Sequence, residues 1–511
     1  MRSTFLQAAF VAALAVLIGF TNVGKFSGAV GDECLHVAAT LEMYNSGNWL
    51  IPTLDDIPYL NKPPLKMWLS MIPIALLGPN NFAFRFLDAL GGVFTALMVW
   101  WFGRRVWNSG LAGVVAAIAL LGSDNYVFNH GIRNAVQDSW LVMLTTGAVI
   151  SGGVVLEQLN REKSLLSSRR LLSLSLLCGT LIAAACMTKS VGGLISFPIL
   201  GLAALLGPIR RNPQKVFTYG LVILSCALLL PALYFVPLYQ IYPALFMQTF
   251  SREVADRAQS GFHNSSQYWF YLEDLWRRRI VSPELLLLGI LVALARVRES
   301  FLVRLALLWA IVPVALYSFA ATRLPWYIAP AFPGMAILVG GLFSETRTFI
   351  RRNPVATGNR WRRPLAIGCL ILFSASLLLE VGLVTRRVLR PKSRAMFDLL
   401  AEDVRSAKLK NPNEVTILID KKFRAKFLEL PYLNILKPLK TEFSVEQLPQ
   451  LAHSNPGRTL VFTSKENFAQ IKEQIPYTSI IRLPRDHLRN RDMVIFQLGN
   501  PPLSDQLKAR K

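Results

Sequence analysis

The sequence predicts a polytopic α-helical membrane protein that ends in a small α/β domain. Of its 511 residues, 53% are hydrophobic and only 17% are charged, whereas soluble proteins usually carry about 25% charged residues. Before residue 390, apolar runs recur at roughly the 20-residue length that crosses a bilayer. Mixed polar sequence follows them, so most of the chain is expected in the membrane and the remainder beside it.

The apolar runs predict about eleven transmembrane helices, and a count of up to about thirteen stays open because several runs are short. They lie near 4–22, 83–103, 110–122, 135–156, 171–187, 191–207, 216–236, 281–295, 301–319, 327–343 and 364–385. The first run could instead be a secretory signal peptide, because Arg2 precedes its apolar core. No small-x-small cleavage site follows it, so a retained first helix is expected.

The charge pattern of the loops predicts how the chain threads through the membrane. Its net charge is +24, which in a soluble protein would suggest nucleic acid as a partner. Much of the surplus instead lies in every second loop, at Arg104, Arg105, Arg161, Lys163, Arg169, Arg170, Arg210, Arg211, Lys215, Arg296, Arg298, Arg304, Arg347, Arg351, Arg352, Arg360, Arg362 and Arg363. The positive-inside rule makes these loops cytoplasmic, and no nucleic-acid partner is expected.

This threading places the N-terminus in the cytoplasm and several long segments on the outer face of a plasma (inner) membrane. These are the loops 23–82, 123–134 and 237–280 and everything after the last span. Long loops are frequent locations of function. Two basic clusters conflict with the positive-inside rule, Arg277 to Arg279 and Arg386 to Arg394.

Residues 386–511 are predicted to form an extracytoplasmic α/β domain after a transmembrane domain at 1–385. Strands are expected at Glu414–Asp420, Arg458–Thr463 and Asp492–Gln497, with a helix at Lys465–Gln474. Residues 386–511 hold 24 Lys plus Arg against 13 Asp plus Glu, so the domain is expected to present a basic face. That face suits anionic lipid headgroups or, alternatively, an anionic acceptor recruited by salt-sensitive steering.

The first outer loop carries two groups of candidate residues. Asp32 and Glu33 directly follow a span, so a carboxylate near the headgroups could act there as a general base. Asp32 could equally cap the helix that follows it. Lys62 precedes Pro63-Pro64, which suits the first turn of a second helix. A lysine at such a helix start could hold a phosphate or extend toward the headgroups.

Further charged residues recur where loops meet spans on the same side. Arg133 and Asp138 lie at the start of one span, where charges by default indicate function. Being five positions apart, they are expected to contact different groups, with a local salt bridge as the alternative. Lys189 lies in a tight turn between two spans, and Arg323 and Tyr327 belong to a short outer hairpin. Their convergence on one face indicates a site for an anionic, lipid-linked substrate.

The motifs of the first loop resemble those of a known family. Asp32-Glu33 is followed by Tyr59-x-x-Lys62-Pro63-Pro64-Leu65 and then Trp68, which is similar to the first loop of bacterial aminoarabinose transferases and protein O-mannosyltransferases. The resemblance covers roughly residues 1–345 and continues, in the family's order, through Arg85-Phe-Leu, Gly103-Arg-Arg, Arg133 to Asp138, Thr188-Lys189 and Arg323-Leu-Pro-Trp-Tyr327. It implies the GT-C fold and an enzyme that uses polyprenyl-phosphate sugars.

The resemblance also implies roles for single residues. Asp32, with Glu33 beside it, would be the catalytic carboxylate that deprotonates or orients the acceptor hydroxyl, and Asp138 would be a second acidic residue near it. The carrier phosphate would be contacted by the cations and phenols of the same face, which are Tyr59, Lys62, Arg133, Lys189, Arg323 and Tyr327.

Two departures from the family pattern bear on the cofactor and the sugar. His263 resembles a loop histidine that joins a metal site in some relatives, but Asn61 stands where relatives commonly have glutamate. A neutral asparagine is a poor zinc ligand, so no cofactor is expected to be required, with a divalent metal as the alternative. Leu35 and His36 replace an arginine and a tyrosine of the aminoarabinose transferases, which argues against that sugar.

The expected reaction is an inverting transfer from a polyprenyl-phosphate sugar to an envelope glycolipid, glycan or protein. No nucleotide site is expected, because glycine-rich phosphate-loop signatures are missing from the sequence. A transporter or lipid flippase is the first alternative, and it would need charged or broken helices near the bilayer midplane and commonly internal repeats. A non-catalytic envelope assembly protein is the second.

Overall fold

The structure is a computed structural model that describes residues 2–25, 32–54, 57–256, 269–278, 281–352, 362–390, 415–420, 439–443, 458–471, 477–481 and 493–498. The chain divides into two compact units. The first, called the helical unit, comprises 1–24, 48–53 and 57–390. The second unit comprises 25–47, 54–56 and 391–511.

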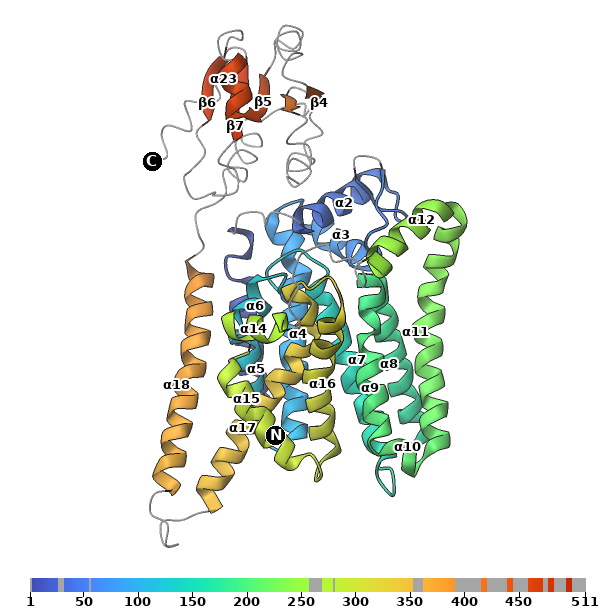
Figure 1. Cartoon of the computed structure of the whole chain (residues 1–511), viewed down its shortest axis with the longest axis vertical. Coiled ribbons are helices and arrows are strands. Elements are labelled where there is room, and N and C mark those ends of the chain that lie inside the picture. The colour runs from blue at the N-terminus through green and yellow to red at the C-terminus, as the bar shows by residue number, and fades with distance from the viewer. Residues whose placement is uncertain are drawn as a thin grey trace. The chain divides into compact units, whose positions relative to one another are not determined.

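The helical unit consists mainly of helices, and most of the long ones lie side by side (Figure 1). Its α-helices are α1 (Arg2–Phe20), α3 (Leu65–Leu77), α4 (Asn81–Val106), α5 (Gly110–Gly122), α6 (Asp124–Phe128), α7 (Asp138–Leu159), α8 (Ser168–Lys189), α9 (Ser196–Leu205), α10 (Pro208–Arg211), α11 (Pro213–Ile241), α12 (Pro243–Phe250), α14 (Phe270–Arg277), α15 (Pro283–Arg296), α16 (Phe301–Phe319), α17 (Phe332–Arg352) and α18 (Arg362–Leu389). Figure 1 shows α3 and α12 at one end of this unit and α10 at the other.

Several short elements connect or precede these helices. They are the 3-10 helices η1 (Val23–Lys25), η2 (Ser190–Ile195) and η4 (Pro325–Ala331), the π-helix η3 (Ser251–Asp256), and the two-residue strands β1 (Thr53–Leu54) and β2 (Ile57–Pro58). The turn at η2 folds tightly against α8, because a Cβ on Gly193 would lie 2.3 Å from the backbone nitrogen of Cys186. Only glycine permits so close an approach.

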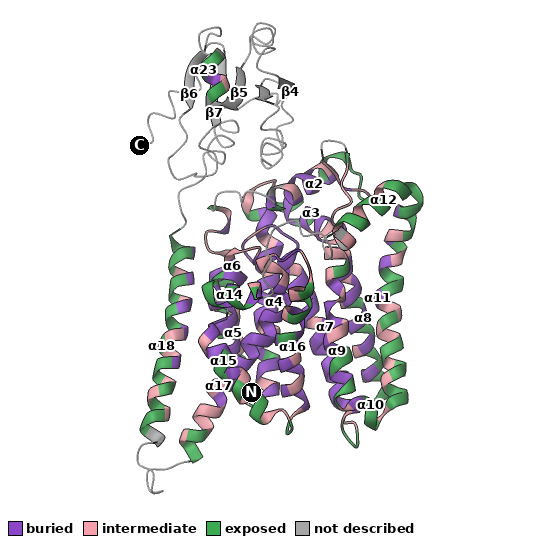
Figure 2. Ribbon diagram, in the orientation of Figure 1, coloured by how far each residue is buried: buried purple, intermediate pink, exposed green. Residues whose placement is uncertain are grey.

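Burial separates inner helices from outer ones, as Figure 2 shows by colour. In the most apolar stretch of α7, 89% of residues are buried, and the segment from η4 through α17 reaches 83%. The corresponding share is 22% in α1, α11 and α18. The outer helices expose large apolar side chains such as Leu229, Leu233 and Leu372. Contiguous apolar surface of this kind marks contact with a membrane or a partner.

In the described part of the chain, eight helical segments are long and apolar enough to cross a membrane. The structure has a helix in each of the predicted apolar runs, but α5, α9 and α15 are much shorter than a full span. The multi-helix membrane architecture is therefore confirmed, and the number of crossings stays a prediction. In the two basic clusters that conflict with the predicted threading, Arg278 pairs with Asp274 and Arg387 approaches Asp124 to 2.6 Å.

The second unit contains α2 (Asp32–Ser46) and a five-stranded sheet. The strands are β3 (Val415–Asp420), β4 (Leu439–Phe443), β5 (Arg458–Ser464), β6 (Tyr477–Ile481) and β7 (Met493–Leu498), and α23 (Lys465–Ile471) directly follows β5. Their order is β4-β3-β5-β7-β6. Strand β3 pairs in parallel with β4 and β5, whereas β7 pairs antiparallel with β5 and β6.

The three strands and the helix predicted after residue 390 are confirmed within a few residues. Strands β4 and β6 were not predicted. In β4, Lys440 and Glu442 alternate with Thr441 and lower its apolar signal, and β6 is only five residues long. Short or charged strands depend on their neighbours more than on their own sequence. That these strands form an extracytoplasmic domain with a boundary at 385/386 stays a prediction.

Candidate functional site

A cavity of about 240 Å³ lies in the helical unit, where segments from six parts of the chain meet. Its wall is made by Asn61, Lys62, Leu141, Lys189, Ser190, Val191, Gly192, Glu253, Tyr317, Ala320, Thr322 and Tyr327. Three of the residues predicted for phosphate binding, Lys62, Lys189 and Tyr327, therefore line one cavity. They are separated in sequence by whole helices, and the bundle brings them together.

Lys62 lies at this wall because two prolines set the entry to α3. Pro64 occupies the N-cap position of α3, and the helix begins at Leu65. The Lys62 ammonium lies 2.8 Å from the carboxylate of Glu253, which belongs to η3. Next to this pair, the Arg252 guanidinium donates to the Asn61 side-chain oxygen. Two consecutive residues of the first loop thus contact two consecutive residues of η3.

A second ion pair holds Lys189 at the cavity wall. Asp138 is the first residue of α7, Lys189 is the last residue of α8, and the Lys189 ammonium donates to the Asp138 carboxylate. The same ammonium lies 5.3 Å from the centre of the Tyr327 ring, within the range of a cation–π interaction. A single lysine in a turn indicates little by itself. In the structure, the contacts of Lys189 with Asp138 and Tyr327 connect α8 with α7 and η4.

His130 joins this cluster, although the sequence gave it no role. Its Nδ1 lies 3.4 Å from the Asp138 carboxylate. Its ring stacks on Trp326 with ring centres 3.6 Å apart and an interplanar angle of 5°. The backbone turns sharply here: His130 has a positive φ of 52°, and a Cβ on Gly131 would lie 2.0 Å from the Tyr126 carbonyl oxygen. The strained turn therefore aims the imidazole at Asp138.

The structure does not bring Arg133 to the cavity wall. Its guanidinium is buried and donates to the backbone carbonyl oxygens of Ile18, Gly19 and Thr21 at the end of α1. The last carbonyls of a helix lack intrahelical partners, so Arg133 caps α1. Burial, together with the charges of Arg85 and Arg387, lowers the pKa of Arg133 to about 9. As predicted, Arg133 and Asp138 contact different groups.

Two other predicted residues lie beside the wall and do not line it. The Arg323 Nε donates to the Ser318 carbonyl oxygen over 3.0 Å, and the Arg323 side chain is buried. Its neighbour Thr322 does line the cavity. The backbone nitrogen of Tyr59 donates to the Pro52 carbonyl oxygen over 2.7 Å, which fixes the loop ahead of Lys62.

Asp32 and Glu33 belong to the second unit, where they form the first turn of α2. Asp32 is exposed, whereas Glu33 is 5% exposed. Both acids stabilise the start of α2, because carboxylates interact favourably with the positive end of the helix dipole. The predicted helix is confirmed, with Asp32 as its first residue. The catalytic role of either acid stays a prediction.

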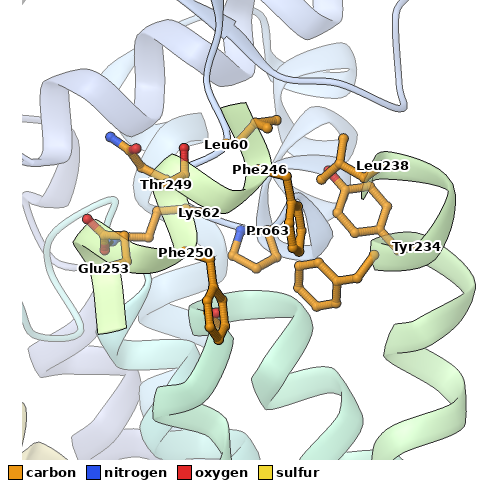
Figure 3. A pocket seen from close by; sticks show the side chains of 12 residues that line it. Leu60, Lys62, Pro63, Tyr234, Leu238, Phe246, Thr249, Phe250 and Glu253 are labelled. Carbon is orange, nitrogen blue, oxygen red and sulfur yellow. Dashed lines mark hydrogen bonds and ion pairs between the residues drawn. The ribbon is translucent and has the colours of Figure 1, made fainter. Parts of the chain in front are cut away.

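A smaller hollow of about 40 Å³ adjoins the cavity and shares Lys62 and Glu253 with it. Figure 3 shows these two side chains at one edge and the aromatic rings of Tyr234, Phe246 and Phe250 around the remainder. The rings come from α11 and α12, and Phe235 links Tyr234 to Phe246, which stacks on Phe250. An apolar surface thus begins directly beside the Lys62 ammonium.

A third lysine–carboxylate pair lies away from the cavity. The Lys66 ammonium on α3 lies 2.8 Å from the Asp88 carboxylate on α4, and their side chains are 4% and 0% exposed. The Ser139 hydroxyl on α7 donates to the same carboxylate. This buried pair connects the helix after Lys62 with the helix that starts at Asp138.

The structure does not test the prediction about a metal ion. His263 lies outside the described residues. Among the described residues, no group of three or more His, Cys, Asp or Glu side chains could hold a metal ion. The Asn61 side-chain oxygen accepts a hydrogen bond from the Arg252 guanidinium.

Sequence reasoning missed Glu253, Ser190, Tyr317 and Thr322, all of which line the cavity. Glu253 could have been noticed as an acid in an outer loop. Nothing in one sequence indicates, however, that it meets a lysine 191 positions away.

Part of the chain is similar in sequence to known glycosyltransferases. Residues 61–235 match the family described as Dolichyl-phosphate-mannose-protein mannosyltransferase. Undecaprenyl phosphate-alpha-4-amino-4-deoxy-L-arabinose arabinosyl transferase from Yersinia pestis (strain Pestoides F) is 24% identical over 69% of this chain and 61% of the relative. The protein of the same name from Edwardsiella ictaluri (strain 93-146) is 29% identical over 61% of this chain and 54% of the relative. The chain thus spans less than two thirds of the length of these relatives.

Solved structures share the fold over almost the whole chain. ArnT from Cupriavidus metallidurans bound to undecaprenyl phosphate has a TM-score of 0.68 at 16% identity, over 97% of this chain and 99% of that one. The archaeal oligosaccharyltransferase AglB from Archaeoglobus fulgidus has a TM-score of 0.60 at 13% identity, over 92% of this chain and 70% of that one. The chain therefore shares the fold of these transferases. The segment that matches the mannosyltransferase family includes Lys62 and Lys189 of the cavity wall and Asp138, the partner of Lys189.

Proposed function

We propose that this chain is a glycosyltransferase that takes a sugar from a polyprenyl-phosphate carrier and transfers it to an envelope acceptor with inversion. The observation that carries the proposal is the convergence of Lys62, Lys189 and Tyr327 on one cavity. Two ammonium groups and a phenol suit a phosphate, since charge-assisted hydrogen bonds to phosphate are strong. The curated relatives named for undecaprenyl-phosphate sugars support a carrier of this class.

The carrier is expected to place its phosphate at Lys62. The aromatic hollow beside Lys62 offers apolar surface for the first carbons of a prenyl chain, and the ammonium lies where a phosphate at the head of that chain would arrive. Arg323 and Tyr59 support the walls of this site, and Arg133 acts at a distance by capping α1.

The proposed transfer moves one proton, forms one bond to the anomeric carbon and breaks another. Asp32 accepts the proton of the acceptor hydroxyl, whose oxygen attacks the anomeric carbon from the face opposite the phosphate. The bond between that carbon and the phosphate oxygen breaks, and its electron pair leaves with the phosphate. The carrier changes from a diester with one negative charge to a monoester that carries about two. Preorganised cations stabilise charge that develops in this way.

In this proposal Asp138 holds Lys189 in place, with His130 on its other side. No metal is assigned a role. The reaction takes place on the outer face of the plasma membrane, where the sheet-containing segment after residue 390 also lies. Its surplus of Lys and Arg over Asp and Glu favours an anionic acceptor, such as a phosphorylated glycolipid, or anionic headgroups.

Replacement of Asp32 tests the proposal. Asp32→Asn should lower the turnover number by about 10²-fold or more, the usual contribution of a general base, with little change in donor binding. The assay follows transfer from an undecaprenyl-phosphate sugar by mass spectrometry, in protein reconstituted in nanodiscs. Glu42→Gln on the same helix is the matched control and should retain activity. Normal turnover in the Asp32 variant would return this residue to a helix-capping role and reopen the transporter alternative.

A further inference from the structure

We propose that Glu253 is a release residue: it competes with the carrier phosphate for Lys62 and weakens binding of the spent carrier more than binding of the donor. The inference rests on the proposed function, because it takes Lys62 as the phosphate ligand. It assigns a role to an acid that otherwise works against phosphate binding.

The geometry places the carboxylate where the phosphate must come. The Glu253 carboxylate oxygen lies 2.8 Å from the Lys62 ammonium, and the two side chains are 14% and 12% exposed. Both residues line the 240 Å³ cavity and the smaller hollow beside it. Any anion that reaches Lys62 from either space therefore comes within a few ångströms of a like charge.

The backbone around Glu253 keeps the carboxylate close when a phosphate arrives. The neighbouring Arg252 donates to Asn61, which directly precedes Lys62. Because adjacent residues contact adjacent residues, η3 stays in register with the first loop when the Lys62–Glu253 contact loosens. Segments of π-helix are frequent at functional sites, and η3 presents Glu253 from one.

The reaction itself changes the strength of the repulsion. The donor is a phosphodiester with one negative charge, whereas the released carrier is a monoester whose second pKa is about 6. Coulomb energy is proportional to charge, so a fixed carboxylate repels the product about twice as strongly as the donor at pH 8. The attraction of Lys62 and Lys189 for the phosphate is also about twice as strong for the product. By itself it would therefore favour binding of the product over the donor. Glu253 offsets that preference, and the carrier leaves.

The alternative role for Glu253 has the opposite sign. If the carboxylate only held the Lys62 ammonium in position, its loss would weaken binding of every phosphate. A release residue, when neutralised, strengthens binding, and it strengthens binding of a monoester more than that of a diester. The sign of the effect and its dependence on ligand charge therefore separate the two roles.

Two short probes of equal chain length test the inference: farnesyl phosphate, a monoester, and farnesyl methyl phosphate, a diester. Their dissociation constants are measured with full-length protein in nanodiscs between pH 5 and pH 8. At pH 8, Glu253→Gln should bind the monoester about tenfold more tightly and the diester about threefold more tightly, since the interaction free energy follows the charge. At pH 5 the two gains should become equal, because the monoester then carries one charge.

Controls separate this inference from the proposed function. Glu345→Gln removes an acid that pairs with Arg296 at 2.8 Å, away from the cavity, and should change neither constant. Each variant is compared with the unmodified protein at the same pH. Unchanged or weaker monoester binding by Glu253→Gln overturns the release role. If Lys62→Met also leaves monoester binding unchanged, the phosphate site itself is wrong; if it weakens binding, only the release role fails.

Discussion

Lys62 lies in the loop just before α3, and Lys66 lies in the first turn of that helix. Each lysine pairs with a carboxylate at 2.8 Å. Their surroundings differ. The side chains of the Lys62–Glu253 pair are 12% and 14% exposed at a cavity, whereas those of Lys66 and Asp88 are 4% and 0% exposed among three helices. The same ion pair is open to a ligand in one place and sealed in the other. Solvent access, and not the distance between charges, decides which pair a phosphate can reach.

The sealed pair has a structural task. Burying two charges costs free energy that their attraction must offset, and removal of one partner leaves an uncompensated buried charge. Asp88 also accepts a hydrogen bond from Ser139, which is next to Asp138 on α7. The pair thus fixes α3, α4 and α7 relative to one another, and with them the positions of Lys62 before α3 and Asp138 at the start of α7.

Loss of one sealed charge should have the largest effect on stability. Lys66→Met leaves Asp88 buried without its cation and should lower the free energy of unfolding by about 3–5 kcal/mol. Thermal unfolding in detergent, monitored by intrinsic fluorescence, measures the loss. A melting temperature equal to that of the unmodified protein would show that water already reaches this pair.

Loss of the open charge should chiefly affect binding. Lys62→Met removes a charged hydrogen-bond donor worth about 1.5–3 kcal/mol, so farnesyl phosphate should bind roughly 10- to 100-fold more weakly. The melting temperature should fall less than in Lys66→Met, because the cavity lets water solvate the Glu253 carboxylate. A larger fall than in the Lys66 variant would invalidate the distinction between the open and sealed pairs.

Removal of both sealed charges should have the smallest effect. A buried ion pair replaced by apolar side chains of similar volume is often close to neutral. The double variant Lys66→Met/Asp88→Leu should therefore recover most of the stability lost in Lys66→Met, to within about 1 kcal/mol of the unmodified protein. Binding of farnesyl phosphate to the double variant is the second readout. A double variant as unstable as the single one would mean that Asp88 stabilises the fold through a contact other than the lysine, such as its hydrogen bond with Ser139.

Sequence reasoning predicted the secondary structure around the site better than the contacts within it. The helix after Pro63-Pro64 and the helix that begins at Asp32 are confirmed, because prolines and acids at a helix start act through local geometry. The strands β4 and β6 were missed for lack of a local pattern. The resemblance to protein mannosyltransferases is confirmed over residues 61–235, and the fold is shared with ArnT from Cupriavidus metallidurans.

The sequence by itself predicted the membrane architecture, the family resemblance and a site of cations and phenols. Hydrophobic run length and motif order are properties of the sequence itself, so they can be read from a single chain. Only the tertiary structure decided which charge meets which. It turned Arg133 toward the carbonyls of α1, gave Lys189 to Asp138 and placed Glu253 on Lys62. These pairings join residues far apart in sequence, so their energies depend on packing and burial that no local pattern contains.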